Sequence, residues 1–449
     1  MTRLFFLFFL CICCCAAAQQ SMTLGRQQKD TLTLGDSAPD GYKSLKRIQI
    51  GKDGHAGFGG SCRFQYLLLD NENWNPASRD PDGYLLSRWL FHTELQFGNR
   101  FRLFAELQSA LAGSRIAPVP VEENALEAHQ LFMEFQPLES IPLTIRLGRQ
   151  EVSFGSQRLI SLRDAPNSRR SFDGVEGIYA REKFRASMFY LHAVLDKLGI
   201  FDDRSSPELK VWGLFLDRTT FGSLPNLNFY YLGFYNRHAL FYDGPGMEKR
   251  HTLAARVFSK DSRWNYDLEG GYQFGSIGRR GISAWSIAFS TTYSFSDMKY
   301  APELGCKADI ISGDGNPYDR NQQTLNTMFG PGAYFGMAAP IAPSNLMDVH
   351  PGVKLHLTGK ITFSFDYAFL WRYSKKDGLY RPNMVPFFES NNATSSYIGS
   401  QISGAITYQA TPDVLLLLGG SWFNSGDYLS DMGMGKDILL GFAGAQVRL

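Results

Sequence analysis

The sequence predicts an all-β fold, an 18-stranded antiparallel transmembrane β-barrel with short periplasmic turns and long extracellular loops. Apolar and polar residues alternate over segments of about ten residues, which suits membrane strands of about 9–11 residues. The chain also contains 35 Phe, 21 Tyr and 44 Gly. Aromatic residues favour strands and glycine favours turns, so the composition suits many strands better than helical domains.

The alternation assigns a face to each side chain, because successive side chains of a strand point to opposite sides of a sheet. Residues 101–108 and 361–367 show the pattern clearly. In the second segment, we expect Phe365 to face lipid and Asp366 to face the lumen. Eighteen candidate strands are centred on Phe64, Trp89, Leu103, Phe132, Ile145, Val175, Phe189, Leu214, Tyr230, Ala255, Leu268, Ile287, Ala308, Val353, Phe365, Ser403, Leu417 and Ala443.

The connections between these strands alternate in length. Residues 98–100, 359–360 and 411–413 read as tight turns, whereas residues 316–346 and 375–396 read as long polar loops. Membrane barrels have this asymmetry between their two ends. Aromatic residues also crowd the expected strand ends, where interfacial girdles lie; these are Trp371, Tyr373, Trp422 and Phe423.

The N-terminus is typical of a secretory signal peptide. Arg3 precedes an apolar stretch at residues 4–15, and three alanines at residues 16–18 provide a small-residue cleavage site. We therefore expect residues 1–18 to be the signal peptide, residues 19–55 a polar segment and residues 56–449 the barrel. A short strand is expected within residues 45–50.

Four of the six cysteines fall within the predicted signal peptide, which leaves Cys62 and Cys306. Two distant cysteines make neither a disulfide framework nor a metal site. We interpret both as small apolar side chains on strands.

The most distinctive sequence is LGRQEVSFGSQRL at residues 147–159, followed by RRSFDGV at residues 169–175. Further motifs follow in order: SGDGNP at 312–317, YFG at 334–336, NLMD at 345–348, LWR at 370–372, DGLY at 377–380 and FNSGDYL at 423–429. Over roughly residues 60–449, this ordered series resembles the alginate-export family of outer-membrane barrels. The resemblance implies an 18-stranded barrel in the bacterial outer membrane and passage of an anionic uronate polysaccharide through an arginine-lined pore.

The alternation places both basic and acidic side chains on the lumen face. The basic candidates are Arg63, Arg88, Arg102, Arg146, Arg256, Lys307, Lys354 and Arg372. The acidic candidates are Glu94, Glu106, Glu134, Asp267, Glu269, Asp309 and Asp366. The lumen is therefore nearly balanced, which differs from the strongly basic pore that the resemblance implies.

The basic excess lies instead in residues 149–170. Arg149, Arg158, Arg163, Arg169 and Arg170 there face only Glu151 and Asp164. If this segment folds into the pore mouth, with Asp173 beside it, its guanidinium groups form a local anion filter. Two alternatives stay open: the arginines pair with lumen carboxylates such as Asp173 and Glu176, or they bind lipopolysaccharide phosphates.

We expect a passive channel whose partners are anionic saccharides or small anions, outer-membrane lipid and lipopolysaccharide. Alternatives are a general or anion-preferring nutrient porin, a non-conducting structural barrel and an outer-membrane enzyme; the last is disfavoured because no nucleophile elbow is evident. Periplasmic secretion subunits are further candidate partners, and the net charge of +2 argues against nucleic acid. No cofactor is expected, although the acidic turn around Asp314 could bind Ca²⁺.

Overall fold

The computed structural model describes residues 48–75, 80–219, 225–259, 262–336, 338, 341–390 and 393–449. The predicted signal peptide 1–18 and residues 19–47 of the predicted polar segment lie outside the described residues.

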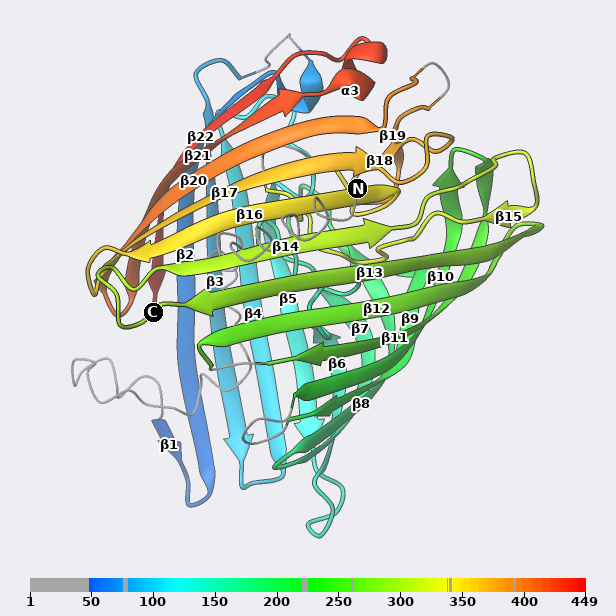
Figure 1. The fold of residues 1–449 in the computed structure, drawn as a ribbon. Coiled ribbons are helices and arrows are strands. Elements are labelled where there is room, and N and C mark those ends of the chain that lie inside the picture. Colours follow the sequence, from blue (N-terminus) through cyan, green and yellow to red (C-terminus); the bar gives the residue numbers. More distant parts are fainter. Residues whose placement is uncertain are drawn as a thin grey trace.

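Long antiparallel strands form the wall of the molecule (Figure 1). The first nine are β2 (Gly54–Asp70), β3 (Tyr84–Phe97), β4 (Phe101–Gly113), β5 (Asn124–Phe135), β6 (Leu143–Gln150), β7 (Phe172–Arg181), β8 (Phe184–Leu195), β9 (Arg204–Arg218) and β10 (Asn226–Phe241). The next nine are β11 (Gly244–Phe258), β12 (Trp264–Ile277), β13 (Arg280–Ser294), β14 (Glu303–Ile311), β16 (Leu346–His356), β17 (Ile361–Arg372), β20 (Tyr397–Thr411), β21 (Val414–Ser425) and β22 (Ile438–Arg448).

The wall is a closed barrel, because each strand pairs with its neighbours along the chain and β22 pairs back with β2. Closure gives each of these eighteen strands a hydrogen-bonded neighbour on both sides, which is what a wall surrounded by hydrocarbon requires. All eighteen predicted strand centres lie in these strands, so the predicted fold is confirmed. The short strand β1 (Ile48–Ile50), within the range expected from the sequence, pairs with the start of β2.

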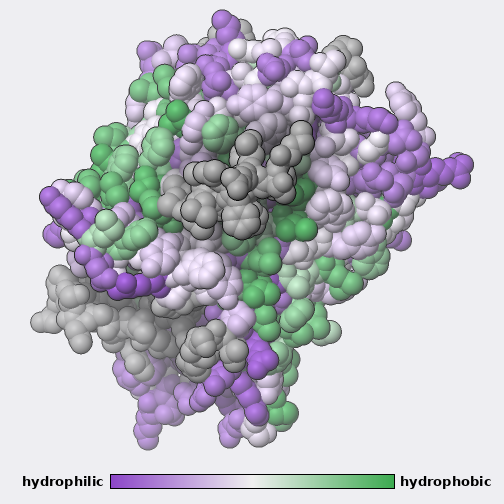
Figure 2. Space-filling view, viewed as in Figure 1, coloured by the Kyte–Doolittle hydropathy of each residue, from purple (hydrophilic) through white to green (hydrophobic). Residues whose placement is uncertain are grey.

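The two faces of the wall differ as the alternation predicts. Phe365 is 36% exposed on the outer face, whereas Asp366 lies inside, within electrostatic range of Lys307 and His350. Hydrophobic residues gather over the middle of the visible wall, and hydrophilic residues gather toward its ends (Figure 2). The outer face is therefore suited to hydrocarbon and the inner face to water.

Smaller elements lie in the connections. These are η1 (Glu72–Trp74), β15 (Asn321–Gln322), β18 (Leu379–Tyr380), β19 (Pro386–Phe388) and α3 (Asp427–Asp431). Figure 1 shows β15, β18, β19 and α3 at one end of the barrel and β1 near the other. We take the end with the long connections as extracellular. The predicted asymmetry is incomplete, because residues 242–243 and 278–279 form tight turns at this same end.

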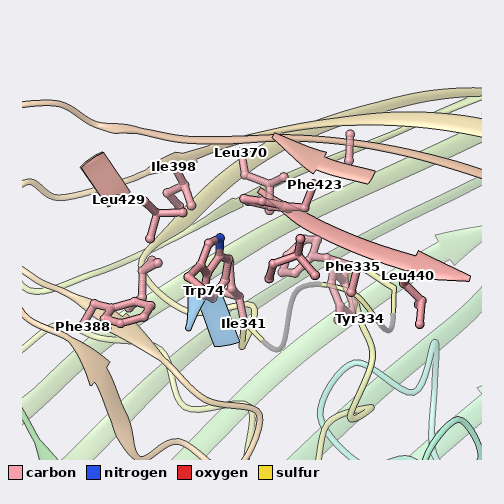
Figure 3. Packing of buried hydrophobic residues seen from close by; sticks show 14 of the residues in the cluster. Trp74, Tyr334, Phe335, Ile341, Leu370, Phe388, Ile398, Phe423, Leu429 and Leu440 are labelled. Carbon is pink, nitrogen blue, oxygen red and sulfur yellow. The ribbon is translucent and has the colours of Figure 1, made fainter. Parts of the chain in front are cut away.

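The extracellular connections pack into a hydrophobic cluster around Trp74 (Figure 3). The Trp74 indole is fully buried, and its ring centroid lies 5.5 Å from that of Phe388 and 5.3 Å from that of Phe423. The prediction that Phe423 belongs to an outer girdle is therefore wrong. Its neighbour Trp422 does lie on the outer face, and adjacent strand residues cannot share a face.

Both described cysteines lie on strands and neither forms a disulfide. Cys62 is buried on β2 and Cys306 is partly buried on β14. Among the described helices, none has the length and apolar character needed to cross a bilayer.

Candidate functional site

The connection between β6 and β7, residues 151–171, turns into the lumen and is here named the constriction segment. Near its middle, the Asp164 carboxylate lies 2.7 Å from the Arg88 guanidinium, and the Asp164 carbonyl oxygen accepts a hydrogen bond of 2.7 Å from Arg63. The Asn167 side chain donates to backbone carbonyl groups of β3 and β4. These contacts fix this part of the segment to β2, β3 and β4.

The β2–β3 register explains why this anchor is acidic. Arg63 and Arg88 lie directly opposite each other, and like charges in that position repel. Asp164 lies between them and offsets the repulsion. Burial alone would raise the pKa of the Asp164 carboxyl, but Arg88, Arg169 and Arg63 outweigh burial and hold this pKa well below its usual range.

The other part of the constriction segment reaches the opposite wall. The Ser156 hydroxyl donates to Glu269 on β12 over 2.6 Å. The Arg158 guanidinium donates to the Tyr334 hydroxyl over 3.0 Å and lies 3.8 Å from Asp309 on β14. The segment therefore crosses the lumen between two anchors of opposite charge.

A second connection, residues 312–345, meets the constriction segment inside the barrel. Ile160 and Phe329 form a β-bridge, with the Phe329 amide donating to Leu159 over 2.9 Å. The Phe329 ring packs edge-on against Phe172, with 4.9 Å between centroids. Arg170 donates to the Phe329 carbonyl group, and burial followed by the nearby Arg163 lowers the pKa of Arg170 to about 9.

The junction of the two connections leaves little space. The cavity lined by Arg158, Tyr334, Thr252 and Glu269 has a volume of about 20 Å³. A volume of that size accommodates about one water molecule. The two connections therefore pack closely where they meet inside the barrel.

Charged side chains on the wall form a ladder across β3–β7. Arg102 lies 2.7 Å from Glu94 and 2.9 Å from Glu134, and Arg146 lies 2.7 Å from Glu134 and 3.4 Å from Glu176. Acidic and basic groups alternate from strand to strand. The near balance of lumen charges that the alternation predicts is thus arranged as direct ion pairs.

The remaining predicted pore residues lie in several environments. Arg256 donates to Asp267 over 2.9 Å, and Lys354 lies 3.4 Å from Glu303. Arg163 pairs with Asp196, and Arg169 lies 3.0 Å from Glu151. Arg63, Arg88, Arg146, Arg169 and Arg372 face inward but are covered, and Arg372 is 0% exposed because it binds carbonyl oxygens of residues 377 and 395.

The predicted pore-lining positions of Arg149 and Asp173 are wrong. They pair across β6 and β7 over 2.8 Å and share the outer face with Leu147 and Val175, which are exposed apolar residues. Gln150 is the residue that points inward. The Arg149–Asp173 pair therefore lies outside the wall and cannot act as a filter within the lumen.

Comparison with protein families gives a match to the alginate export family over residues 55–435. The chain belongs to this family. Its channel proteins lie in the outer membrane, so the apolar outer face contacts lipid and the constriction segment lies within a channel. Comparison with curated proteins finds no match.

Solved outer-membrane channels share the fold at low sequence identity. Pseudomonas aeruginosa OccK11 (OpdR) is 11% identical, with a TM-score of 0.56 over 88% of this chain and 96% of that chain. Acinetobacter baumannii OccAB1 is 12% identical, with a TM-score of 0.57 over 88% of this chain and 97% of that chain. Pseudomonas aeruginosa OpdK, in a structure with vanillate, is 8% identical, with a TM-score of 0.56 over 88% of this chain and 98% of that chain.

Two residues of the constriction were not predicted from the sequence. Tyr334 accepts from Arg158, donates to Asp309 over 2.5 Å and lies under Lys307, whose Nζ is 3.5 Å from the ring centroid. Phe329 joins the two connections. Tyr334 lies in one of the family-like motifs, which was the available signal, whereas Phe329 lies in none of them.

Among the described residues, one group has a spacing compatible with a metal: Glu106, His129 and Glu151. Both nitrogens of the His129 ring already lie near carboxylates, 3.1 Å from Glu127 and 2.8 Å from Glu151. Both ring nitrogens are thus already engaged by carboxylates. Arg169 supplies a further cation beside Glu151, so ion pairs account for this cluster.

The acidic turn around Asp314, where Ca²⁺ binding was considered, forms internal hydrogen bonds. The Asp314 carboxylate accepts from the Asn316 amide over 2.9 Å, and the Asp314 amide donates to Asp377 over 2.9 Å. Asp377 also accepts from Thr324 and Tyr380, and burial raises the pKa of its carboxyl to about 6. The geometry is that of a turn within the extracellular connections.

Proposed function

We propose that this outer-membrane channel conducts short anionic saccharides passively and has no enzymatic role. The observation that carries the proposal is the position of Arg158 on the constriction segment inside the lumen, beside Tyr334 and Asp309. Among the described residues, its nearest carboxylate is Asp309 at 3.8 Å, whereas Arg88 and Arg102 have carboxylates at 2.7 Å. A loosely paired guanidinium can exchange its partner for a carboxylate of the substrate.

The mixed charges around Arg158 also suit transport. A saccharide carboxylate loses water as it enters the constriction, and Arg158 offers it two parallel hydrogen bonds in return. Asp309 and Asp267 nearby limit the strength of that binding, so the solute can leave again. The cavity of about 20 Å³ is far smaller than a sugar ring. We therefore propose that the constriction segment shifts to admit the solute.

Current block by an oligouronate in planar bilayers tests this proposal. Replacement of Arg158 with Gln should weaken block by on the order of tenfold, because a charge-assisted bidentate contact is lost. Arg279 is exposed in the tight turn 278–279. Arg279→Gln is therefore the matched control, and the oligouronate should block this variant as it blocks the wild type. Unchanged block in Arg158→Gln would contradict the proposal.

A general nutrient porin is the second candidate, and the ion-paired ladder across β3–β7 favours it. A neutral oligosaccharide of the same length distinguishes the two functions. An anion-preferring channel should be blocked by the oligouronate at lower concentration, and a general porin should be blocked equally by both. Small anions are a further candidate class, since OpdK has been crystallised with the carboxylate vanillate.

A further inference from the structure

The outer face of β9–β12 carries an apolar groove of about 590 Å³. Its sides include Leu214, Phe229 and Leu253, which are large and exposed. Ala255 and Gly270 lie opposite each other between them, and their small size creates the depression. The groove lies in the lipid-facing part of the wall, so an apolar chain is the kind of group that would fill it.

A row of aromatic side chains lies on the extracellular side of this groove. Trp212 and His251 flank Gly233 in the strand register, with 6.4 Å between their ring centroids. A side chain at Gly233 would collide with the Trp212 indole, so the indole lies directly over the backbone. His251 hydrogen-bonds Tyr231 over 2.8 Å. Amphipathic rings of this kind mark the boundary between hydrocarbon and headgroups.

Two lysines follow one step further toward the extracellular end. Lys210 and Lys249 flank Tyr235 in the register of β9, β10 and β11. The Lys210 Nζ lies 5.8 Å from the Tyr235 ring centroid. Val211 and Arg250, their chain neighbours, are fully buried inside the barrel, so the two lysines point outward.

Neither lysine has an acidic partner among the described residues at salt-bridge distance. The nearby Glu208 is instead engaged by Arg237 at 3.1 Å and His238 at 2.9 Å. The lysine backbones are two strand spacings apart, about 10 Å, so their flexible side chains can converge on one anion between them. The surface thus combines an apolar groove, an aromatic row and two unpaired cations in that order.

We propose that this surface binds a phosphorylated, acylated lipid of the outer leaflet, namely lipopolysaccharide. One acyl chain lies in the groove beside Gly270, and a phosphate of the sugar headgroup lies between Lys210 and Lys249. The order of the three zones matches the order of acyl chain, interface and phosphate in such a lipid. The inference rests on the membrane placement of the barrel and is independent of the proposed substrate.

Native mass spectrometry of the purified barrel with added lipid A tests the proposal. The double variant Lys210→Ala, Lys249→Ala should bind lipid A on the order of tenfold or more weakly, and the charge-preserving Lys210→Arg, Lys249→Arg should retain binding. The wild type should bind lipid A without its phosphates as weakly as the alanine variant binds intact lipid A. Lys375→Ala, Lys376→Ala in an extracellular loop is the matched control. Heat-modifiable gel mobility checks that each variant is folded.

A second variant tests the groove itself. A Cβ added at Gly270 would meet only a backbone oxygen at 3.9 Å, so Gly270→Leu is compatible with the strand backbone and should place its side chain in the depression. It should weaken lipid A binding while both lysines remain. Equal binding by the alanine variant and the wild type would overturn the proposal. So would a protein dimer that Gly270→Leu abolishes, since the groove would then hold a second copy of this chain.

Discussion

The two anchors of the constriction segment differ in the sign of the charge that the segment contributes. At one wall, an acidic residue of the segment, Asp164, enters a group of arginines. At the other wall, a basic residue, Arg158, lies among Asp267, Asp309 and Tyr334. The Asp164 carboxylate lies 2.7 Å from Arg88, whereas the shortest carboxylate distance of Arg158 among the described residues is 3.8 Å, to Asp309.

This difference teaches that a basic residue near the pore is not by itself a binding group. Arg88 is required to hold Asp164, so its charge is used within the protein. Arg158 has no equally close carboxylate among the described residues, so its charge remains available to a solute. Pairing, and not the number of arginines, therefore decides which part of the lumen can recognise an anion.

The largest effect is expected at the tight anchor. Asp164→Asn should leave Arg88 buried without its carboxylate and destabilise the attachment of the segment by about 3–5 kcal/mol. The segment should then leave the lumen, and single-channel conductance should rise. Asp173→Asn on the outer face is the control and should leave conductance unchanged. A wild-type conductance in Asp164→Asn would show that the carbonyl contacts alone hold the segment.

A smaller effect is expected at the looser anchor. Arg158→Gln should weaken the attachment by about 1–3 kcal/mol, since it removes charged hydrogen bonds but leaves Lys307 near Asp309. It should also shift the reversal potential toward cations at low salt and much less at 1 M, where the Debye length is only about 3 Å. Arg279→Gln is again the control. The neighbouring Arg280 would be unsuitable as a control, because it pairs with Asp243.

Acid should release the Asp164 anchor only at low pH. The pKa of Asp164 is lowered in the folded protein, so its stabilising contribution is complete above the ordinary Asp pKa of about 3.9 and is lost as pH falls toward the lowered value. A rise in conductance caused by release of this anchor should therefore appear only below about pH 4. The Asp164→Asn channel, already detached, should show no such rise.

The strands could be predicted from the sequence because their signal is local: a period of two over ten residues identifies each strand. Phe423 and Arg149 were misplaced although the same rule applied to them. Leu147 and Arg149 must share a face, and an exposed Leu147 places Arg149 outside. The contact of Ile160 with Phe329 could not be predicted, because neither connection has a periodic pattern and the two are far apart in the chain.

The smallest effect is expected at Arg149, which tests the outward placement directly. Arg149 and Asp173 pair on the lipid-facing side, so exchanging them as Arg149→Asp with Asp173→Arg keeps the attraction and moves only the charges. Because both groups lie outside the wall, the reversal potential at 0.1 M salt should stay at the wild-type value. Assembly, read from heat-modifiable mobility, should also be kept. A shift in selectivity as large as that of Arg158→Gln would mean that Arg149 reaches the lumen, and the assignment of both anchors would then have to be revised.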